Sequence, residues 1–172
     1  GRIRECYRPG HADYTFDAKY GFRDYRGGGR SSGRETIGRV AAGAVASKLL
    51  LKLGIRITAY TKAIGNIEVP ESDYDYGCIL TNPLYMPNTS YAEAAADYLD
   101  NCIHKQDSSG GMIECVIDGM PAGVGEPVFN KLDANLARAV MSIGAVKGVE
   151  IGDGFAVTCA AGSSNNDAFC AD

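Results

Sequence analysis

Apolar side chains between residues 33 and 53 recur every three or four positions, which is the spacing of one helix face. Ser32 and Glu35 occupy the N-cap and N3 positions of a capping box, and Gly54 is a natural stop. Alanine and glycine crowd the middle of the stretch, so other elements can approach it closely. We therefore predict a helix that begins near Gly33, ends before Gly54 and is largely buried.

Alternation of apolar and polar positions predicts strands at residues 55–61, 112–117, 146–151 and 155–160. Helical spacing returns from Ser90, where a second Ser-x-x-Glu box ends at Glu93, and again over residues 129–143. The segment 70–88 is rich in Asp, Tyr, Pro and Asn and predicts a loop. Because helices and strands alternate, we expect helices layered on sheets.

Residues 1–32 keep neither period and are predicted to form an irregular loop region. Six aromatic side chains argue against disorder there, and a loop of this length within a compact domain is usually functional. The 172 residues suit a single domain with a proper core, in which residues 33–172 supply the alternating helices and strands.

Composition is that of an ordinary globular protein, with 45% hydrophobic and 22% charged residues. The longest apolar run, residues 40–51, is too short to span a bilayer, so we expect no membrane partner. The cysteines show neither a Cys-x-x-Cys pair nor zinc-ligand spacing, which favours reduced thiols, mostly in the core of a cytoplasmic protein, and no metal site. They are Cys6, Cys78, Cys102, Cys115, Cys159 and Cys170.

Charge is unevenly distributed along the chain. Residues 1–40 carry nine basic and five acidic residues, a net +4, whereas the whole chain carries −4. Focused positive charge in an acidic protein points to a discrete anionic ligand more than to a long polyanion. A solvated surface with local ion pairs would give the same counts, so charge alone leaves both interpretations open.

The strongest candidate for an anion site is the glycine-rich segment that opens the first predicted helix. Gly27–Gly29 are followed by Arg30, Ser31 and Ser32, and Arg34 and Arg39 lie on or near the first turns. Unpaired N–H groups at a helix start attract phosphate or carboxylate, and glycine lets a ligand approach the backbone. The segment is neither a Walker A loop nor a dinucleotide fingerprint. The alternative is a flexible turn with an ordinary cap.

His11 follows a Pro-Gly corner, and imidazole titrates near neutrality, so a positioned histidine can serve as an acid or base. More commonly, a lone histidine in a loop has a structural role and is hydrogen-bonded to the backbone. His104, at the end of the second predicted helix, is expected to be structural. Ser31 and Ser32 have no evident triad partners, so a nucleophilic serine is not expected.

Five segments in order closely resemble the chorismate synthase family. They are Arg8–Thr15 (RPGHADYT), Asp24–Thr36 (DYRGGGRSSGRET), Arg39–Ala44 (RVAAGA), Gly119–Phe129 (GMPAGVGEPVF) and Met141–Gly152 (MSIGAVKGVEIG). The resemblance implies an α+β fold, a β-α-β sandwich with helices packed between antiparallel sheets, and a homotetramer. It also implies a lyase of the shikimate pathway that eliminates phosphate from 5-enolpyruvylshikimate-3-phosphate to give chorismate. The family needs reduced FMN, for which NADPH is a candidate reductant.

The resemblance also implies roles for individual residues. His11 is the catalytic acid beside the flavin; Arg30, Ser31, Ser32 and the Gly144–Ala145 pair contact FMN; and Arg8, Arg34 and Arg39 bind the anionic substrate. Many relatives have Asn-Ala where this chain has Gly144–Ala145, so here Gly144 offers no side chain.

The family's Gly-Glu-Ser-His segment, with its second active-site histidine, is not found in this sequence. Neither are the downstream Asn-His-Ala-Gly-Gly, Lys-Pro-Thr-Ser and Arg-His-Asp-Pro segments. We therefore expect a central fragment of the family chain that is inactive alone. Two other classes stay open: a non-catalytic assembly module, and an Arg/Gly/Tyr-rich nucleic-acid module, which the acidic net charge disfavours.

Overall fold

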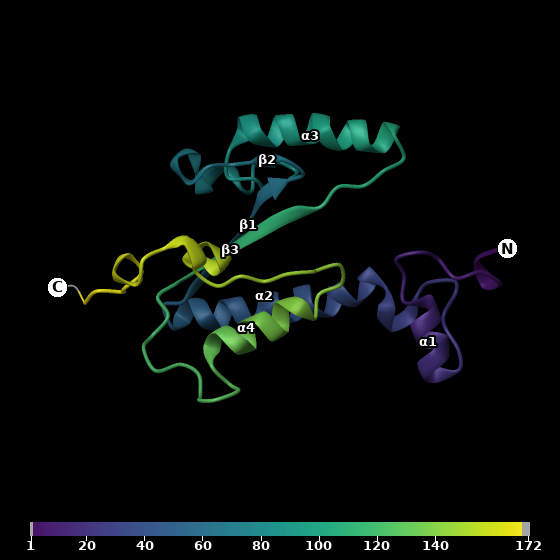
Figure 1. Cartoon of the computed structure of the whole chain (residues 1–172), viewed down its shortest axis with the longest axis horizontal. Helices are drawn as coiled ribbons and strands as arrows, with labels where there is room; N and C mark the ends of the chain where they lie inside the picture. The colour runs from purple at the N-terminus through teal and green to yellow at the C-terminus, as the bar shows by residue number, and fades with distance from the viewer. Residues whose placement is uncertain (1, 170–172) are drawn as a thin grey trace. The chain divides into compact units, whose positions relative to one another are not determined.

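The computed structural model describes residues 2–169, which divide into two compact units. Unit 1 comprises the chain up to Val45 and from Pro121 onward, and unit 2 comprises Ala46–Met120. The α-helices are α1 (Asp13–Tyr20), α2 (Thr36–Lys52), α3 (Thr89–His104) and α4 (Leu132–Met141) (Figure 1). The strands are β1 (Arg56–Ile64), β2 (Ile67–Glu68) and β3 (Gly111–Asp118).

The sheet of unit 2 is antiparallel, with the strand order β2-β1-β3. The pairing of β1 with β3 runs from Arg56 opposite Asp118 to Ile64 opposite Gly111. A tight turn at Gly65 joins β1 to β2, with φ at +59°. A Cβ on Gly65 would lie 2.6 Å from a ring carbon of Tyr98 in α3, so the turn requires glycine.

The core of unit 2 lies where α3 covers the sheet (Figure 1). Val69, Met86, Ala92 and Ala95 form a buried cluster. Partly buried side chains pack around it, namely Ile64, Ile67, Tyr74, Leu84 and Tyr91. This layering of a helix on an antiparallel sheet confirms the predicted α+β class.

A carboxylate in the middle of β3, Glu114, accepts hydrogen bonds from three side chains. Tyr60 donates to its Oε2 over 2.5 Å, Lys62 to Oε1 over 3.1 Å and Tyr74 to Oε2 over 3.1 Å. Partial burial opposes ionisation of Glu114, but the three hydrogen bonds outweigh it, so the pKa of Glu114 lies below its ordinary value. Burial, together with the hydrogen bond to Glu114, raises the pKa of the Tyr60 hydroxyl.

The predicted loop at residues 70–88 is confirmed, and it contains two short 3₁₀ turns, Glu71–Asp73 and Tyr76–Cys78. The Asn82 side chain organises it. Its Nδ2 donates to the carbonyls of Cys78 and Met86 over 2.8 and 2.9 Å, and its Oδ1 accepts from the N–H groups of Leu84 and Met86. The loop is therefore held by local hydrogen bonds together with the burial of Met86 in the core.

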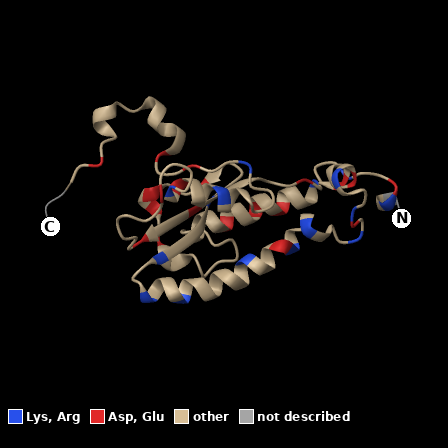
Figure 2. Ribbon diagram, turned by 90° about the horizontal axis from the view of Figure 1, so that it is seen from below, with Lys and Arg blue, Asp and Glu red and all other residues tan. Residues whose placement is uncertain are grey.

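Unit 1 is held together differently. The buried hydrophobic side chains among residues 2–169 all come from unit 2, between Ile55 and Ala95, whereas the one buried residue described in unit 1 is Asp13. Basic and acidic positions are interspersed near the N-terminus (Figure 2). The described part of unit 1 is therefore held together mainly by polar contacts.

The expectation that the first long helix is largely buried is wrong. Helix α2 forms, but it buries none of its side chains, and Val40 and Val45 are 67% and 72% exposed. Between Arg39 and Lys48 no residue of α2 is charged, and its ribbon is tan through the middle (Figure 2). The sequence shows which side chains are apolar, but burial also requires a partner, which residues 2–169 do not supply.

Three further expectations need correction. Residues 1–32 are not wholly irregular, because α1 forms there and ends at Gly21, whose φ is +76°. The strands predicted at 146–151 and 155–160 are absent from the described chain, and Gly154–Cys159 is a 3₁₀ helix instead. A strand needs a neighbouring strand to pair its backbone groups, and within residues 2–169 these segments find none.

Details of capping and burial also differ from the prediction. The N-cap of α3 is Asn88, whose side chain accepts from the N–H groups of Ser90 and Tyr91, rather than Ser90 itself. Helix α4 is shorter than the predicted 129–143.

Five cysteines are free thiols, but three of them are exposed rather than in the core: Cys6, Cys115 and Cys159. Cys170 lies outside the described residues. Among the described residues, no helix is long and apolar enough to cross a membrane.

Replacing Glu114 with glutamine should lower the free energy of unfolding at pH 7 by about 1–3 kcal/mol, because charged hydrogen bonds to Lys62 and two tyrosines are lost. The pKa of Glu114 is lowered by folding, so its carboxylate stabilises the protein above the unfolded pKa. This contribution disappears as pH falls through the folded-state pKa, and the difference between the two proteins should shrink below about pH 4.

Urea unfolding followed by tyrosine fluorescence measures this difference, since the chain has ten tyrosines and no tryptophan. Asp100→Asn, at an exposed position on α3, is the matched control and should change little. Equal destabilisation by Glu114→Gln at pH 7 and pH 3 would contradict the assigned charge state.

Candidate active site

His11 lies in an exposed turn at the start of unit 1. Its backbone N–H donates to the carbonyl of Arg8 over 3.3 Å, and its Nδ1 lies 3.0 Å from the carbonyl oxygen of Pro9. Because a carbonyl can only accept, Nδ1 carries the hydrogen in this contact. Nε2 is therefore the ring atom at which His11 can take up and release a proton.

Arg8, at the other end of this turn, is engaged by Asp13. The Arg8 Nε and Nη2 atoms donate to the two carboxylate oxygens of Asp13, each over 2.9 Å, and the Arg8 backbone N–H donates to Oδ2 over 3.0 Å. Asp13 is only 4% exposed. The side-chain and backbone hydrogen bonds from Arg8 hold the pKa of Asp13 far below its usual range, and the same pair raises the pKa of Arg8.

Arg23 is the second arginine at Asp13. Its Nη1 lies 2.8 Å from Asp13 Oδ2, and its Nε lies 3.3 Å from a carboxylate oxygen of Asp17. Its Nη2 donates to three backbone carbonyls, those of Ile3, Arg4 and Cys6. The guanidinium also lies 4.9 Å from the ring centre of Tyr7. Arg23 thus joins the start of the chain to α1.

The glycine segment forms a turn around Asp24. The Asp24 carboxylate accepts from the N–H groups of Arg26 and Gly27 over 3.0 and 3.2 Å, and these bonds lower its pKa. Gly28 and Gly29 both have positive φ, +79° and +52°, which explains why glycine is needed there. The chain then turns into the 3₁₀ helix Gly33–Glu35 and directly into α2.

The residues expected to contact FMN follow this turn. The Ser31 hydroxyl donates to the carbonyl of Gly28 over 2.6 Å, whereas the Ser32 Oγ accepts from the Arg34 N–H over 3.2 Å and keeps its own hydrogen available for a ligand. Ser32 is thus a helix cap as predicted, although its partner is the N–H of Arg34 rather than that of Glu35.

The arginines beside the glycine segment differ in how they are held. The Arg30 side chain is 85% exposed and has one ion pair, with Glu35 over 3.3 Å. The Arg34 Nη1 lies 3.1 Å from where a Cβ of Gly27 would stand, so any larger residue at Gly27 would press on the guanidinium. Both cations lie within the same short segment, where an anion can be bound by charge and backbone N–H groups together.

Arg39, on the second turn of α2, reaches a different segment. Its Nη2 donates to the carbonyl and the Oγ of Ser142 over 3.0 and 3.1 Å. Ser142 is the C-cap of α4 and leads into the Gly144–Ala145 pair. Ala145 has φ at +71°, and a Cβ on Gly144 would meet nothing within 4 Å, so the space beside Gly144 is open.

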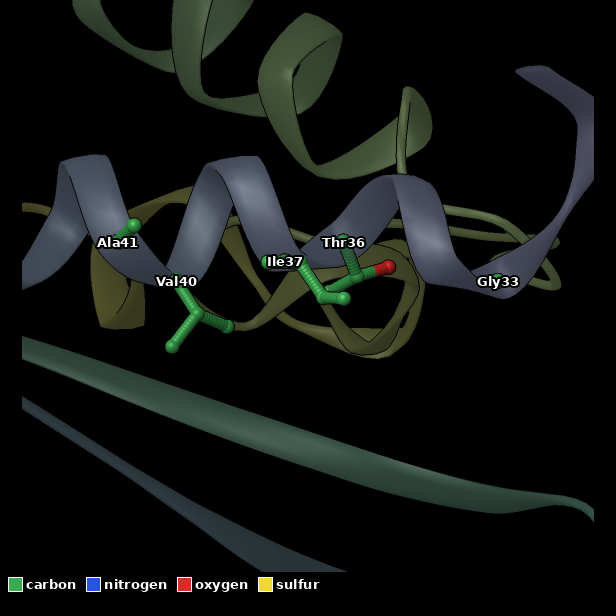
Figure 3. Close-up of a pocket in the computed structure, with 5 residues that line it drawn as sticks. All are labelled: Gly33, Thr36, Ile37, Val40 and Ala41. Atoms are coloured by element: carbon green, nitrogen blue, oxygen red, sulfur yellow. The ribbon is translucent and has the colours of Figure 1, made fainter. Parts of the chain in front are cut away.

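A shallow and widely open apolar hollow lies next to the glycine segment. It is lined by residues of α2 and the turn before it: Gly33, Thr36, Ile37, Val40 and Ala41 (Figure 3). Polar groups of the loop and an exposed apolar surface therefore adjoin along one stretch of chain.

The structure brings the predicted residues together in three groups. Arg8 and His11 share one turn, Arg30 to Arg34 share the glycine segment, and Arg39 is joined to the segment before Gly144. Within residues 2–169 the described hydrogen bonds and ion pairs do not link these groups to one another. The same part of the chain holds no cluster of three potential metal ligands among its His, Cys, Asp and Glu side chains.

Two residues of the site were missed from the sequence, Asp13 and Arg23. Asp13 pairs with Arg8 five positions away across the Pro-Gly corner, and Arg23 acts on carbonyls up to twenty positions away. Neither spacing belongs to a helix or a strand. An acid shortly after an Arg-Pro-Gly corner was the only available signal.

Comparisons with known proteins agree on one family. The profile of the family "Chorismate synthase" matches residues 1–172. The chain is 64% identical to the chorismate synthase of Lachnoclostridium phytofermentans over 170 residues, which are 99% of this chain and 46% of that protein. It is 62% identical to the chorismate synthase of Agathobacter rectalis over 167 residues, 97% of this chain and 46% of that protein.

A crystal structure of a chorismate synthase superposes with a TM-score of 0.82 at 34% identity, covering 91% of this chain and 52% of that one. The chain thus spans about half the length of the curated relatives it matches. On the family profile and this level of identity, the chain belongs to the chorismate synthase family.

Proposed function

We propose that the protein carrying this chain eliminates phosphate from 5-enolpyruvylshikimate-3-phosphate to give chorismate. In this reaction the C3–O bond to phosphate breaks and the proton on C6 is lost, so a double bond forms without net oxidation. The supporting observation is that the family's Arg-Pro-Gly-His and Gly-Gly-Gly-Arg-Ser-Ser segments both belong to unit 1, where each forms a turn that carries an ion-paired arginine.

The residues present fit reduced FMN as the cofactor. Arg30 and the Ser32 hydroxyl can hold the phosphate group at the glycine segment, and the adjoining apolar hollow of α2 suits an aromatic ring. Ser31 would have to exchange its bond to Gly28 to donate. When bound, reduced FMN supplies electron density to the substrate as phosphate leaves.

The chain's own residues have separate tasks in this proposal. Arg8, Arg34 and Arg39 bind the anionic groups of the substrate, which carries one phosphate and two carboxylates. His11 holds a proton at Nε2 as the acid beside the flavin. Gly144 and Ala145 would contact FMN through their backbone. Stabilising the charge of the leaving phosphate is an electrostatic task for the arginines.

The family resemblance supports three further parts of the proposal: a homotetrameric assembly, a cytoplasmic location and NADPH as the reductant of the flavin. The alternatives of an assembly module and a nucleic-acid module predict no FMN binding. Titration of the protein with FMN, followed by flavin absorbance, separates them from the enzyme.

The direct test supplies the full-length protein carrying this sequence with reduced FMN and 5-enolpyruvylshikimate-3-phosphate without oxygen, and measures chorismate. We expect turnover by the wild-type protein. His11→Ala should lower kcat by about 10²–10⁴-fold, because a general acid is lost, while the affinities for FMN and for the substrate change much less. Isolated residues 1–172 should form no chorismate. Absence of turnover in the full-length protein would refute the function, and near-normal turnover of His11→Ala between pH 6 and 8 would refute the role of His11.

Ser32→Ala should weaken FMN binding by about 3- to 10-fold, the loss of roughly one hydrogen bond. It should also cost about 0.5–2 kcal/mol of stability, because the cap on Arg34 N–H is removed. The FMN dissociation constant and the urea midpoint are therefore measured together. Ser164→Ala is the matched control, since that hydroxyl donates to Ala161 in a different turn. An unchanged dissociation constant in folded Ser32→Ala would remove Ser32 from the FMN site.

A further inference from the structure

We propose that Asp13 is a positioning residue for the reaction, which fixes the turn carrying His11 and is itself held in place by Arg23. The proposal rests on the proposed function, in which His11 is the acid. The observation behind it is that the buried carboxylate of Asp13 is shared by two guanidinium groups.

Asp13 holds Arg8 at three points. Two are side-chain hydrogen bonds in the parallel arrangement that makes Arg–carboxylate pairs directional, and the third comes from the Arg8 backbone. Backbone and side chain of Arg8 are thereby both fixed relative to the first turn of α1. The carboxylate of Asp13 also suits this place, because helix N-termini attract negative charge.

Because Asp13 fixes Arg8, it also fixes His11, which is hydrogen-bonded within the same turn. The Arg8 carbonyl accepts the His11 N–H, and the Pro9 carbonyl accepts the proton on His11 Nδ1. The main chain of the turn therefore sets both the position of the His11 backbone and the orientation of its ring. Because Asp13 anchors the first residue of this turn, displacing it would displace Nε2.

Arg23 fixes Asp13 from the other side. Its guanidinium contacts Asp13 and Asp17 of α1 and donates to carbonyls of Ile3, Arg4 and Cys6. The Arg23 side chain is only 8% exposed, so it is a fixed part of the structure rather than a mobile surface cation. The two arginines, Arg8 and Arg23, balance the charges of the two carboxylates, Asp13 and Asp17.

A direct chemical role for Asp13 does not fit the geometry. Both carboxylate oxygens already accept hydrogen bonds, and the residue is 4% exposed, so no oxygen faces a ligand. Asp13 therefore acts through Arg8 and the turn, which is a role in positioning rather than in proton transfer.

The test uses the full-length protein with Asp13→Asn, which keeps the size of the side chain and removes its charge. We expect kcat to fall about 10²-fold, the cost of a misplaced catalytic group, with a smaller change in FMN affinity. Asp133→Asn is the matched control: it is also an acid in the first turn of a helix, but it is exposed and pairs only with Lys131 and the Ala134 N–H. Its kcat should stay at the wild-type value.

A double-mutant cycle separates positioning from general destabilisation. If Asp13 acts on turnover through His11, adding Asp13→Asn to His11→Ala should lower kcat little further, because the ring that it positions is already gone, whereas an effect through the substrate contact of Arg8 should raise KM. Equal loss of kcat from Asp13→Asn in both backgrounds would overturn the proposal, as would a wild-type kcat in the single variant.

Hydrogen–deuterium exchange of peptides covering residues 7–16, read by mass spectrometry, gives an answer that does not depend on turnover. Exchange should become roughly tenfold faster in Asp13→Asn than in wild type or Asp133→Asn, the change expected from losing a hydrogen bond to a charged group. Unchanged exchange in Asp13→Asn would overturn the inference even if the enzyme is active. If exchange is faster in Asp13→Asn but the wild-type protein makes no chorismate, the proposed function is refuted and the positioning of the turn by Asp13 stands.

Discussion

A single buried carboxylate, Asp13, holds two arginines in the N-terminal segment of this chain, and the described arrangement of that segment depends on it. Arg8 on one side carries the turn with His11, and Arg23 on the other side gathers the start of the chain. Burying a carboxylate is costly unless it is paired and fully hydrogen-bonded. Here the pairing is complete enough to keep Asp13 ionised, and removing either arginine would leave the buried carboxylate with one cation instead of two. Such an arrangement specifies geometry more strictly than a hydrophobic contact, and a catalytic turn needs strict geometry.

The two units illustrate different ways of fixing a structure. Unit 2 has an apolar core of Val69, Met86, Ala92 and Ala95, and its polar network at Glu114 lies on the sheet beside it. In unit 1 the described side chains are held by ion pairs, capping bonds and bonds to main-chain carbonyls, while the apolar residues of α2 stay exposed. The proposed site belongs to unit 1. Its groups are therefore positioned by electrostatics and backbone hydrogen bonds, which are the interactions that also recognise phosphate and carboxylate.

Local pattern predicted the elements whose own residues define them. Helices α2 and α3 and strands β1 and β3 follow from a period of 3.6 or 2, and residue type alone made the glycine segment and His11 candidates for the site. Helix α1 has no apolar stripe, so periodicity could not predict it. The strands expected at 146–151 and 155–160, and the burial of α2, require partners that a local pattern does not contain. The Asp13 pairing was missed for a related reason, because it joins residues across a corner and up to twenty positions apart.

The ionisation of Asp13 tests this account most directly. Because the pKa of Asp13 is lowered by folding, the ion pairs should stabilise the N-terminal segment above the unfolded pKa and be lost only as pH falls through the much lower folded-state value. The measurement is a pH titration of the protein with ¹³C-labelled aspartate carboxyls, with the Asp13 signal assigned by its loss in Asp13→Asn. The account predicts that this signal stays at its ionised position down to pH 3, well below the ordinary aspartate pKa of about 3.9. A midpoint near that ordinary value would show that Asp13 is not held between two arginines, and would contradict the account.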